Sequence, residues 1–317
     1  MVMPHLNAGG KLKKVDNYSK KVLLTGATGF TGSYVLKGLL EAGWQVDILV
    51  RPSSSMSLIQ DVVTQVGVHV YNGEIEETMR IVSSVSPYVV IHVASMVVGE
   101  HKPSDVTGII QSNILFGSQL LEAMARAGVR RFINTGTYWE HFQNRDYSPV
   151  ELYAASKFAF QNILQYYVEL QGINAITLKL FDAYGPNDPR SKLMNLLLRA
   201  SDTKERIQMT KGEQQIDLIH VKDVAAAYLI AAERLCDDLV EGHEIFGVGS
   251  GHRLSVKQVV ALFENVSGEK LNIEWGTRPY RAREVMEPCR LETLPGWVPR
   301  ISLEDGLSSL LLLNRAK

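Results

Sequence analysis

The sequence predicts an α/β protein built on a doubly wound parallel sheet, with a smaller, discontinuous C-terminal substrate lobe. The first observation is a rhythm: between residues 21 and 180, short apolar, β-branched runs alternate with longer helical patterns. Strands without polar alternation are typical of parallel sheets that helices cover on both faces. The second observation is a glycine-rich segment directly between the first strand and the first helix. The third is the loss of the rhythm after Tyr184, where turn residues follow.

Six runs are apolar enough to form buried strands. They are residues 21–24, 46–50, 68–71, 88–93, 131–134 and 175–180. The apolar periodicity between them predicts helices, and three of these end at a glycine suited to a C-cap. The helices are expected after Gly32 up to Gly43, from about 106 to 127 before Gly128, after Tyr153 up to Gly172, and near 255–266.

The domain organisation follows from this pattern. Residues 1–19 show neither helical nor strand periodicity and are predicted to be a loose leader. Residues 20–182 are predicted to form a dinucleotide-binding domain. Residues 183–317 are predicted to form mainly the substrate-binding lobe, with strands and helices at about 216–247 returning to the first domain.

Two of the predicted helices, at 106–127 and 153–171, carry apolar side chains on more than one face. One apolar stripe is enough to cover a sheet. The excess predicts a second burial surface, for which two explanations stay open. It is either the contact of a homodimer or a surface crowded by the C-terminal region.

Composition excludes several classes of protein. The 317 residues include 33 Lys and Arg against 34 Asp and Glu, a net charge of −1, which gives no reason to expect nucleic acid or a membrane surface as partner. The two cysteines are too few for a disulfide framework or a cysteine-rich metal site. No apolar run approaches the roughly 18 residues of a membrane helix. We therefore expect a cytoplasmic protein without a metal.

The segment from Thr25 to Gly32 predicts a phosphate-binding loop of the Rossmann type. Gly26 suits the tight turn, Gly29 allows the backbone to approach a pyrophosphate, and Gly32 allows close packing of helix on strand. The strand before and the helix after agree with this interpretation. The alternative is a glycine-rich turn without a ligand.

The end of the second strand indicates which dinucleotide binds. An acidic residue there would accept a hydrogen bond from a ribose 2′-hydroxyl, but the sequence has Arg51, followed by Pro52 and Ser53. A guanidinium pairs with a 2′-phosphate instead, so NADP(H) is favoured over NAD. The alternative is that Arg51 only solvates the strand end.

A catalytic constellation follows from three further positions. Tyr153 and Lys157 lie at i and i+4, so they share one face of a helix, and a nearby ammonium lowers the pKa of a phenol. Thr137 ends the fifth strand, where ligands lie in a doubly wound sheet. Asn113 lies on the preceding helix. His92, in the fourth strand, is expected to be a core histidine.

Together the glycine loop, Asn113, Thr137 and the Tyr153–Lys157 pair resemble the extended short-chain dehydrogenases/reductases, in their NAD(P)-dependent nucleotide-sugar epimerase/dehydratase group. The resemblance implies that Tyr153 is the catalytic acid/base, that Lys157 lowers its pKa and holds the nicotinamide ribose, and that Thr137 binds the reacting oxygen. The expected cofactor-binding residues are Gly26, Thr28, Gly29, Phe30, Gly32, Arg51, Ser53, Ala94, Ser95, Asn113, Tyr153 and Lys157.

Departures from the family pattern indicate which of the family's reactions to expect. Sugar dehydratases of the group carry an Asp-Glu pair after the catalytic Thr, where this sequence has Tyr138 and Trp139. Asp182 replaces the usual Asn after the sixth strand, and Ile216-Asp217 replaces the usual Arg-Asp. A dehydratase is therefore not expected.

Two segments, 179–193 and 278–288, resemble those of the CDP-paratose and CDP-abequose synthases, which are 4-keto reductases. Cations in these segments suit the pyrophosphate of a nucleotide sugar. The expected substrate-binding residues are Thr137, Tyr138, Asp182, Arg190, Lys192, Arg281 and Arg283.

The sequence thus predicts an NADP-dependent oxidoreductase that reduces the 4-keto group of a nucleotide-linked deoxyhexulose, with a CDP-sugar favoured and Tyr153 as proton donor. One alternative is a nucleotide-sugar epimerase with bound NAD(P), in which the same groups first oxidise and then reduce. Another, from a different class, is a non-catalytic NADP-binding sensor or scaffold. Oxidation of NADPH in the presence of keto sugars separates the three.

Overall fold

The computed structural model describes residues 20–315, so the leader predicted for residues 1–19 lies outside the described residues. Its centre is a parallel sheet with the strand order β10-β6-β5-β4-β1-β2-β3. The strands are β1 (Lys21–Thr25), β2 (Gln45–Val50), β3 (Gly67–Val70), β4 (Val89–His92), β5 (Arg131–Thr137), β6 (Asn174–Leu180) and β10 (His243–Val248). The order reverses between β1 and β4, which opens a crevice at the carboxyl ends of these strands. The doubly wound α/β fold is confirmed.

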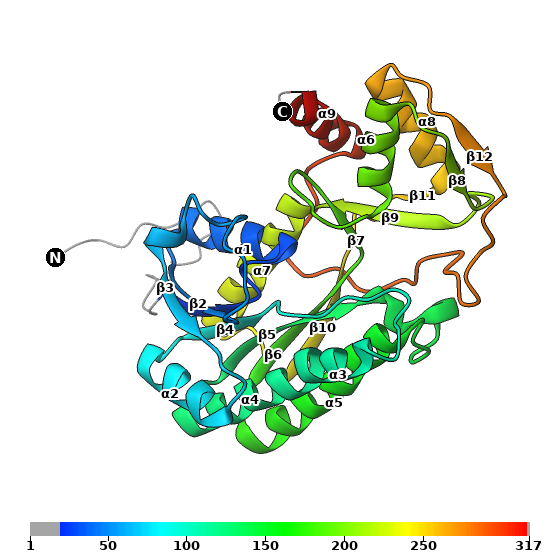
Figure 1. The fold of residues 1–317 in the computed structure, drawn as a ribbon. Coiled ribbons are helices and arrows are strands. Elements are labelled where there is room, and N and C mark those ends of the chain that lie inside the picture. The colour runs from blue at the N-terminus through cyan, green and yellow to red at the C-terminus, as the bar shows by residue number, and fades with distance from the viewer. Residues whose placement is uncertain (1–19, 316–317) are drawn as a thin grey trace, which may run out of the picture.

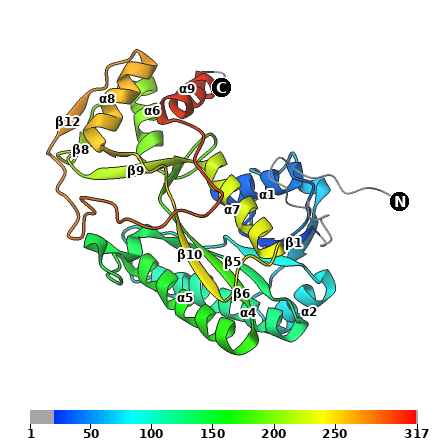
Figure 2. The same cartoon turned by 180° about the vertical axis from the view of Figure 1, so that it is seen from behind.

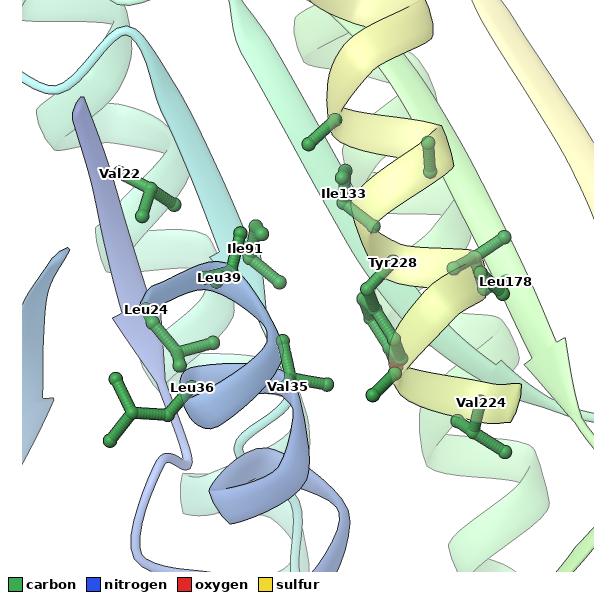
Figure 3. Packing of buried hydrophobic residues seen from close by; sticks show 14 of the residues in the cluster. Val22, Leu24, Val35, Leu36, Leu39, Ile91, Ile133, Leu178, Val224 and Tyr228 are labelled. Carbon is green, nitrogen blue, oxygen red and sulfur yellow. The ribbon is translucent and has the colours of Figure 1, made fainter. Parts of the chain in front are cut away.

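Helices cover both faces of this sheet (Figure 1). One face carries α1 (Phe30–Glu41) and α7 (Val221–Cys236), and the other carries α2 (Ile75–Val85), α4 (Phe116–Ala127) and α5 (Leu152–Gln171). Figure 3 shows the first face, where β-branched and leucine side chains of the strands contact the two helices. The labelled residues of this core are Val22, Leu24, Ile91, Ile133 and Leu178 from the strands and Val35, Leu36, Leu39, Val224 and Tyr228 from the helices.

The helix predicted from 106 to 127 runs without a break in its path, but its backbone hydrogen bonds change from an α to a π pattern and back. It consists of α3 (Asp105–Ile110), the π-helical turn η2 (Gln111–Leu115) and α4. A π turn adds a residue to the helix and changes which side chain faces inward. Asn113 lies in this turn and is fully buried.

The smaller lobe is built from segments after β6 (Figure 2). Its strands are β7 (Asp182–Tyr184), β9 (Gln215–His220) and β11 (Arg253–Ser255) in one sheet, and β8 (Ile207–Met209) and β12 (Ile273–Trp275) in another. Its helices are α6 (Leu193–Thr203), α8 (Val256–Ser267) and α9 (Leu303–Arg315). Short 3-10 turns lie at η1 (Val63–Gln65), η3 (Tyr138–Glu140) and η4 (Phe142–Asn144).

Residues 216–247, which the sequence predicts to return to the dinucleotide-binding domain, contribute to both the main sheet and the smaller lobe. Helix α7 packs on α1 and β10 pairs with β6, whereas β9 pairs with β7 and β11 in the smaller lobe. Strand β7 begins two residues after β6 ends, so the smaller lobe starts at the carboxyl edge of the main sheet. This connection places the lobe beside the crevice.

Candidate active site

A cavity of about 860 Å³ opens at the carboxyl ends of the main strands, next to the smaller lobe. Ligand sites of proteins typically have a volume of about 300–1,000 Å³. The glycine loop lines one part of the cavity, and Thr137, Tyr153 and Asp182 line another. The predicted cofactor site and the predicted reaction site are therefore parts of one cavity.

The glycine loop has the backbone that phosphate binding requires. Gly26 has a φ of +76°, and a Cβ there would lie 2.5 Å from the backbone nitrogen of Ala94. A Cβ at Gly32 would overlap the carbonyl oxygen of Gly26. Gly29 is the N-cap of α1, without a side chain to cover the first N–H groups of the helix. These groups suit a pyrophosphate, so the loop fits the dinucleotide.

Arg51 directly follows β2 and lines the same part of the cavity. Its backbone N–H donates to Ser54 Oγ at 3.1 Å, and the side chain is exposed. Within residues 20–315, no side chain or carbonyl binds the Arg51 guanidinium. Asp47, the acidic residue of β2, binds His69 at 2.7 Å. Arg51 therefore has its charge available for an anionic group of a ligand.

Thr137 lies at the end of β5 and Tyr153 at the start of α5. Thr137 is buried, its Oγ1 accepts the Trp139 N–H at 3.3 Å, and its own N–H donates to Glu140 Oε1 at 3.1 Å. These two bonds form a capping box that fixes the turn η3. Tyr153 lies in the first turn of α5, and its hydroxyl interacts with that of Ser95. Both side chains line the cavity.

Burial raises the pKa of Tyr153, and the charge of Glu140 raises it further. The side-chain hydrogen bond between Tyr153 and Ser95 opposes this rise, and Lys157 is not among the groups that shift the Tyr153 pKa. Burial lowers the pKa of Lys157 to about 8, against the effect of Glu140. In the protein without a ligand, burial is the main cause of the raised Tyr153 pKa. The lowering of this pKa by Lys157 stays a prediction. Tyr153 is protonated at neutral pH.

Lys157 lies behind Tyr153, one helical turn further along α5, and does not line the cavity. It is fully buried, and its Nζ has no hydrogen-bond partner within the described part of the chain. A buried ammonium without partners costs several kcal/mol or more unless a ligand satisfies it. Ribose hydroxyls would satisfy it, so this residue also fits the cofactor.

Asn113 does not line the cavity, so its role in cofactor binding stays a prediction. Its Oδ1 accepts the Met96 N–H at 2.7 Å and the Ser95 hydroxyl at 3.2 Å. Its Nδ2 donates to Met96 O at 3.1 Å and Ser156 Oγ at 3.0 Å. These four bonds use its hydrogen-bonding capacity. Asn113 thereby fixes the loop after β4, which carries Ser95, against α5.

The substrate side of the cavity is formed by side chains that bind one another. Asp182 accepts a hydrogen bond from the Tyr138 hydroxyl at 2.7 Å and pairs with Lys192 at 3.4 Å. Tyr138 stacks on Phe181, with ring centroids 4.7 Å apart. The Lys192 Nζ also lies 5.5 Å from the Trp139 ring centroid. Asp182 is the only carboxylate that lines the cavity among residues 20–315.

The predicted arginines divide between the cavity and the surface. Arg190 lines the cavity, but both carboxylate oxygens of Asp188 accept hydrogen bonds from its guanidinium at 2.7 Å. The Arg190 guanidinium also lies 4.6 Å from the centroid of the Phe30 ring. Arg281 and Arg283 do not line the cavity. Arg281 lies 3.7 Å from Glu100, and Arg283 donates to Ser148 Oγ at 2.7 Å.

Most of the predicted site residues lie together. Those that line the cavity are Gly26, Thr28, Gly29, Phe30, Gly32, Arg51, Ser53, Ala94, Ser95, Thr137, Tyr138, Tyr153, Asp182, Arg190 and Lys192. Those that do not are Asn113, Lys157, Arg281 and Arg283. His92 is a core histidine that binds Thr25 at 2.8 Å, and burial lowers its pKa to about 3.

Sequence reasoning missed Glu140, a fully buried carboxylate next to Thr137. It pairs with Lys179 at 2.9 Å. The β5–β6 register, in which Gly136 lies opposite Lys179, brings the two together. No local signal in the sequence indicates a pair whose members are so far apart in the chain.

No helix within the described residues is long and apolar enough to span a membrane. No cluster of three or more His, Cys, Asp or Glu side chains in residues 20–315 is arranged to hold a metal ion. The cations that line the cavity are Arg51, Arg190 and Lys192. A cavity with this balance of charge suits an anionic ligand such as a pyrophosphate.

Comparison with curated proteins gives relatives that span nearly the whole chain. The chain is 27% identical to a CDP-abequose synthase of Salmonella muenchen over 93% of this chain and 98% of the relative. It is 30% identical to a UDP-glucose 4-epimerase of Streptomyces lividans over 80% of this chain and 83% of the relative. A crystal structure of a UDP-glucose 4-epimerase from Thermotoga maritima with UDP-glucose superposes with a TM-score of 0.81 at 23% identity, over 93% and 98% of the two chains.

A family model described as the NAD dependent epimerase/dehydratase family matches residues 22–249. This match covers the dinucleotide-binding domain and the first part of the smaller lobe. It agrees with the extended short-chain dehydrogenase/reductase type that the glycine loop, Thr137 and the Tyr153–Lys157 pair predict. The chain is an enzyme of this type and belongs to the NAD dependent epimerase/dehydratase family.

Proposed function

We propose that this protein reduces the 4-keto group of a nucleotide-linked deoxyhexulose, with a CDP-sugar as the favoured substrate and NADPH as the reductant. The observation that carries the proposal is that one cavity contains both sets of residues. The glycine loop and Arg51 line one end of it, and Thr137 and Tyr153 line the other. The similarity to a CDP-abequose synthase along nearly the full length of both chains supports the same substrate class.

Bound NADPH would supply the hydride for the carbonyl carbon. Tyr153 donates the proton to the carbonyl oxygen, and its raised pKa keeps that proton in place until the oxygen becomes basic. The Thr137 hydroxyl holds the same oxygen and stabilises the negative charge that develops on it. Lys157, whose buried Nζ has no hydrogen-bond partner among the described residues, would hold the ribose hydroxyls of the nicotinamide cofactor.

Arg51 supports NADPH over NADH. It is exposed at the end of β2, and no described residue binds its guanidinium. A 2′-phosphate would be its partner, and a ribose 2′-hydroxyl would find no carboxylate there. An exchangeable NADPH also suits net reduction, because each turnover consumes one molecule.

The lining of the cavity supports reduction over dehydration. Removing a carbon-bound proton and expelling a hydroxyl requires an acid and a base beside the sugar. Among residues 20–315 only Asp182 offers a carboxylate to the cavity, and Tyr138 and Lys192 bind it. Epimerisation remains the second candidate, which the 30% identity to the Streptomyces lividans epimerase favours.

The test is a spectrophotometric assay of purified protein with NADPH and a panel of CDP-, UDP-, GDP- and dTDP-linked 4-keto sugars. We expect NADPH oxidation only with a keto sugar, and fastest with the CDP-linked one. Interconversion of two hydroxyl epimers without net change in NADPH would replace the proposal with the epimerase. No turnover with any sugar, together with tight NADPH binding, would favour the non-catalytic sensor or scaffold.

We further propose a homodimer through α4 and α5. The inner faces of these helices carry buried residues such as Leu120 and Phe160, while Tyr166 and Leu170 on α5 are exposed. Tyr166 is 54% exposed and Leu170 is 66% exposed, which leaves large apolar side chains without cover in the single chain. Sedimentation of wild type and Leu170→Glu tests the contact. A cytoplasmic location stays a prediction.

A further inference from the structure

Two cations lie in the segment that joins β7 to α6, and they face different ends of the cavity. Arg190 and Lys192 both line the cavity. The Lys192 Nζ pairs with Asp182 at 3.4 Å and lies 5.5 Å from the centroid of the Trp139 ring, at the substrate end. The Arg190 guanidinium instead lies 4.6 Å from the centroid of the Phe30 ring, which belongs to the glycine loop. The two cations are therefore close in the chain but have neighbours at opposite ends of the cavity.

The orientation of Arg190 is fixed by hydrogen bonds within its own segment. Its Nε and Nη2 donate to the two carboxylate oxygens of Asp188 at 2.7 Å, and Nη2 also donates to the Ala183 carbonyl at 3.0 Å. The Asn195 Nδ2 donates to the backbone carbonyls of both Asp188 and Arg190, at 2.6 and 2.7 Å. Side chain and backbone are thus held in place without a ligand, which lowers the entropic cost of binding one.

This segment of the smaller lobe also contacts the first helix of the dinucleotide-binding domain. The Tyr34 hydroxyl on α1 donates to the Pro186 carbonyl at 2.9 Å. Phe30 is the first residue of α1 and directly follows the N-cap Gly29, which has no side chain to cover the first N–H groups of the helix. The Arg190 guanidinium therefore lies beside the end of α1 where a dinucleotide pyrophosphate is expected.

One nitrogen of the Arg190 guanidinium is left for a ligand. Asp188 and Ala183 use Nε and Nη2, and within residues 20–315 the Nη1 group donates to no side chain or carbonyl. The Arg190 side chain is 31% exposed, whereas that of Asp188 is 6% exposed. A planar guanidinium that binds a carboxylate along one edge still offers N–H groups along another. Nη1 can therefore donate to a phosphate oxygen in the cavity.

We propose that Arg190 binds the pyrophosphate of the dinucleotide cofactor, so that the smaller lobe contributes a cation to the cofactor site. Lys192 is then the cation of this segment that serves the nucleotide sugar. The proposal moves Arg190 from the expected substrate-binding residues to the cofactor. It rests on cofactor binding in the proposed function, but not on the reduction.

The test measures binding in wild type and Arg190→Met, without turnover. Fluorescence titration gives the Kd of NADPH and of NADH. Displacement of NADPH gives the Kd of adenosine 2′-monophosphate, which carries the 2′-phosphate but no pyrophosphate. We expect Arg190→Met to weaken NADPH and NADH alike by about tenfold, the effect of one charge-assisted hydrogen bond, and to leave adenosine 2′-monophosphate unchanged. Arg51→Asp should instead weaken NADPH and adenosine 2′-monophosphate and spare NADH.

Lys192→Met is the reciprocal control from the same segment. It should leave the affinities for NADPH and NADH unchanged and weaken CDP, which carries the pyrophosphate of the favoured substrate without its sugar. Arg190→Met should leave the affinity for CDP unchanged. Arg199→Met removes an arginine of α6 that pairs with Glu205 at 2.7 Å outside the cavity, and it should change none of these affinities.

A second variant covers the case in which Arg190→Met does not fold because Asp188 is left buried without its partner. Arg190→Met/Asp188→Asn removes both charges and should show the same loss of NADPH and NADH affinity. Circular dichroism and thermal melting identify which variants are folded.

Equal NADPH and NADH affinities in wild type and a folded Arg190 variant would overturn the proposal, and weaker CDP binding in that variant would return Arg190 to the substrate. An equal loss for adenosine 2′-monophosphate would also overturn it, because this probe has no pyrophosphate to lose. Failure of the proposed reduction has a different signature. The protein would then bind NADPH with the expected dependence on Arg190 but would oxidise it with no keto sugar.

Discussion

The cofactor end of the cavity is lined largely by backbone, whereas the substrate end is lined by side chains that already bind one another. At the cofactor end, Gly26 and Gly32 bring the chain close to itself, and Arg51 extends into solvent without a partner among residues 20–315. At the substrate end, Asp182 holds both Tyr138 and Lys192. The first arrangement leaves backbone N–H groups and one guanidinium for a ligand, whereas in the second the charged side chains already have partners.

From this difference we can predict which substitutions should affect NADPH and which should affect the sugar. Substitutions at the cofactor end should change the affinity for NADPH and leave the sugar untouched. Substitutions at the substrate end should change KM for the sugar by small amounts, because each charge there is already partly neutralised by a neighbour. Only the residues between the two ends should change the chemical step.

The largest effect is expected for Tyr153→Phe, which lies between the two ends. The substitution keeps the ring and removes the proton donor, and general acid catalysis contributes about 10²–10⁴-fold. Turnover should fall by that factor, while NADPH affinity stays within a few-fold because Arg51 and the glycine loop are unchanged. Steady-state kinetics and fluorescence titration with NADPH measure the two quantities. Loss of NADPH binding in this variant would show that the ends are not independent.

Thr137→Val should have the next largest effect. It removes one donor to the oxygen on which charge develops, which typically costs about 10²–10³-fold in kcat. The loss should appear in kcat rather than in KM. Because Thr137 Oγ1 also caps η3, circular dichroism and thermal melting serve as controls for the fold. A change in KM alone would mean that Thr137 only binds the sugar.

Arg51→Asp tests the cofactor end by itself. A charge-assisted hydrogen bond contributes about 1.5–3 kcal/mol, so NADPH affinity should fall by roughly tenfold or more while NADH affinity is retained. Arg130→Asp, far from the glycine loop in sequence and not a cavity residue, is a control for the change of charge. Equal NADPH affinity in wild type and Arg51→Asp would contradict the assignment of the 2′-phosphate site.

The smallest effect is expected for Lys192→Met at the substrate end. Lys192 is half-buried and already paired with Asp182, and such pairs contribute about 1 kcal/mol or less. KM for the nucleotide sugar should rise by about fivefold at most, with kcat unchanged. Lys222→Met, at a position outside the cavity, should leave both parameters unchanged. A large loss of kcat in Lys192→Met would place this lysine in the chemical step.

The same comparison explains what the sequence predicts and what it does not. The strands, the glycine loop and the Tyr153–Lys157 pair follow from local patterns, because strand alternation, tight turns and i, i+4 spacing depend on neighbours in the chain. Strand β10 was expected only within the region at about 216–247 that returns to the first domain, without bounds of its own. Strand β9, from the same region, pairs in the smaller lobe instead. Strand pairing depends on contacts between distant segments, which local patterns do not record.

The roles of the polar residues depend on the same distant contacts. Asn113 lies on the helix before α5, where the sequence suggests a ligand-binding residue. In the structure, the loop after β4 and Ser156 on α5 occupy all four of its hydrogen bonds. Arg283 is a cation in a suitable segment, yet Ser148 binds it outside the cavity. Glu140 becomes meaningful only when the β5–β6 register places Lys179 beside it.

The central claim is that the protein transfers a hydride to a 4-keto sugar while Tyr153 supplies the proton. The most direct measurement is the stoichiometry of NADPH oxidised to sugar reduced, with a CDP-linked 4-keto deoxyhexose, in wild type and Tyr153→Phe. The account predicts one NADPH per sugar in wild type and a rate about 10²–10⁴-fold lower in the variant. Epimerisation without NADPH consumption, or a variant that reduces the sugar at the wild-type rate, would contradict it.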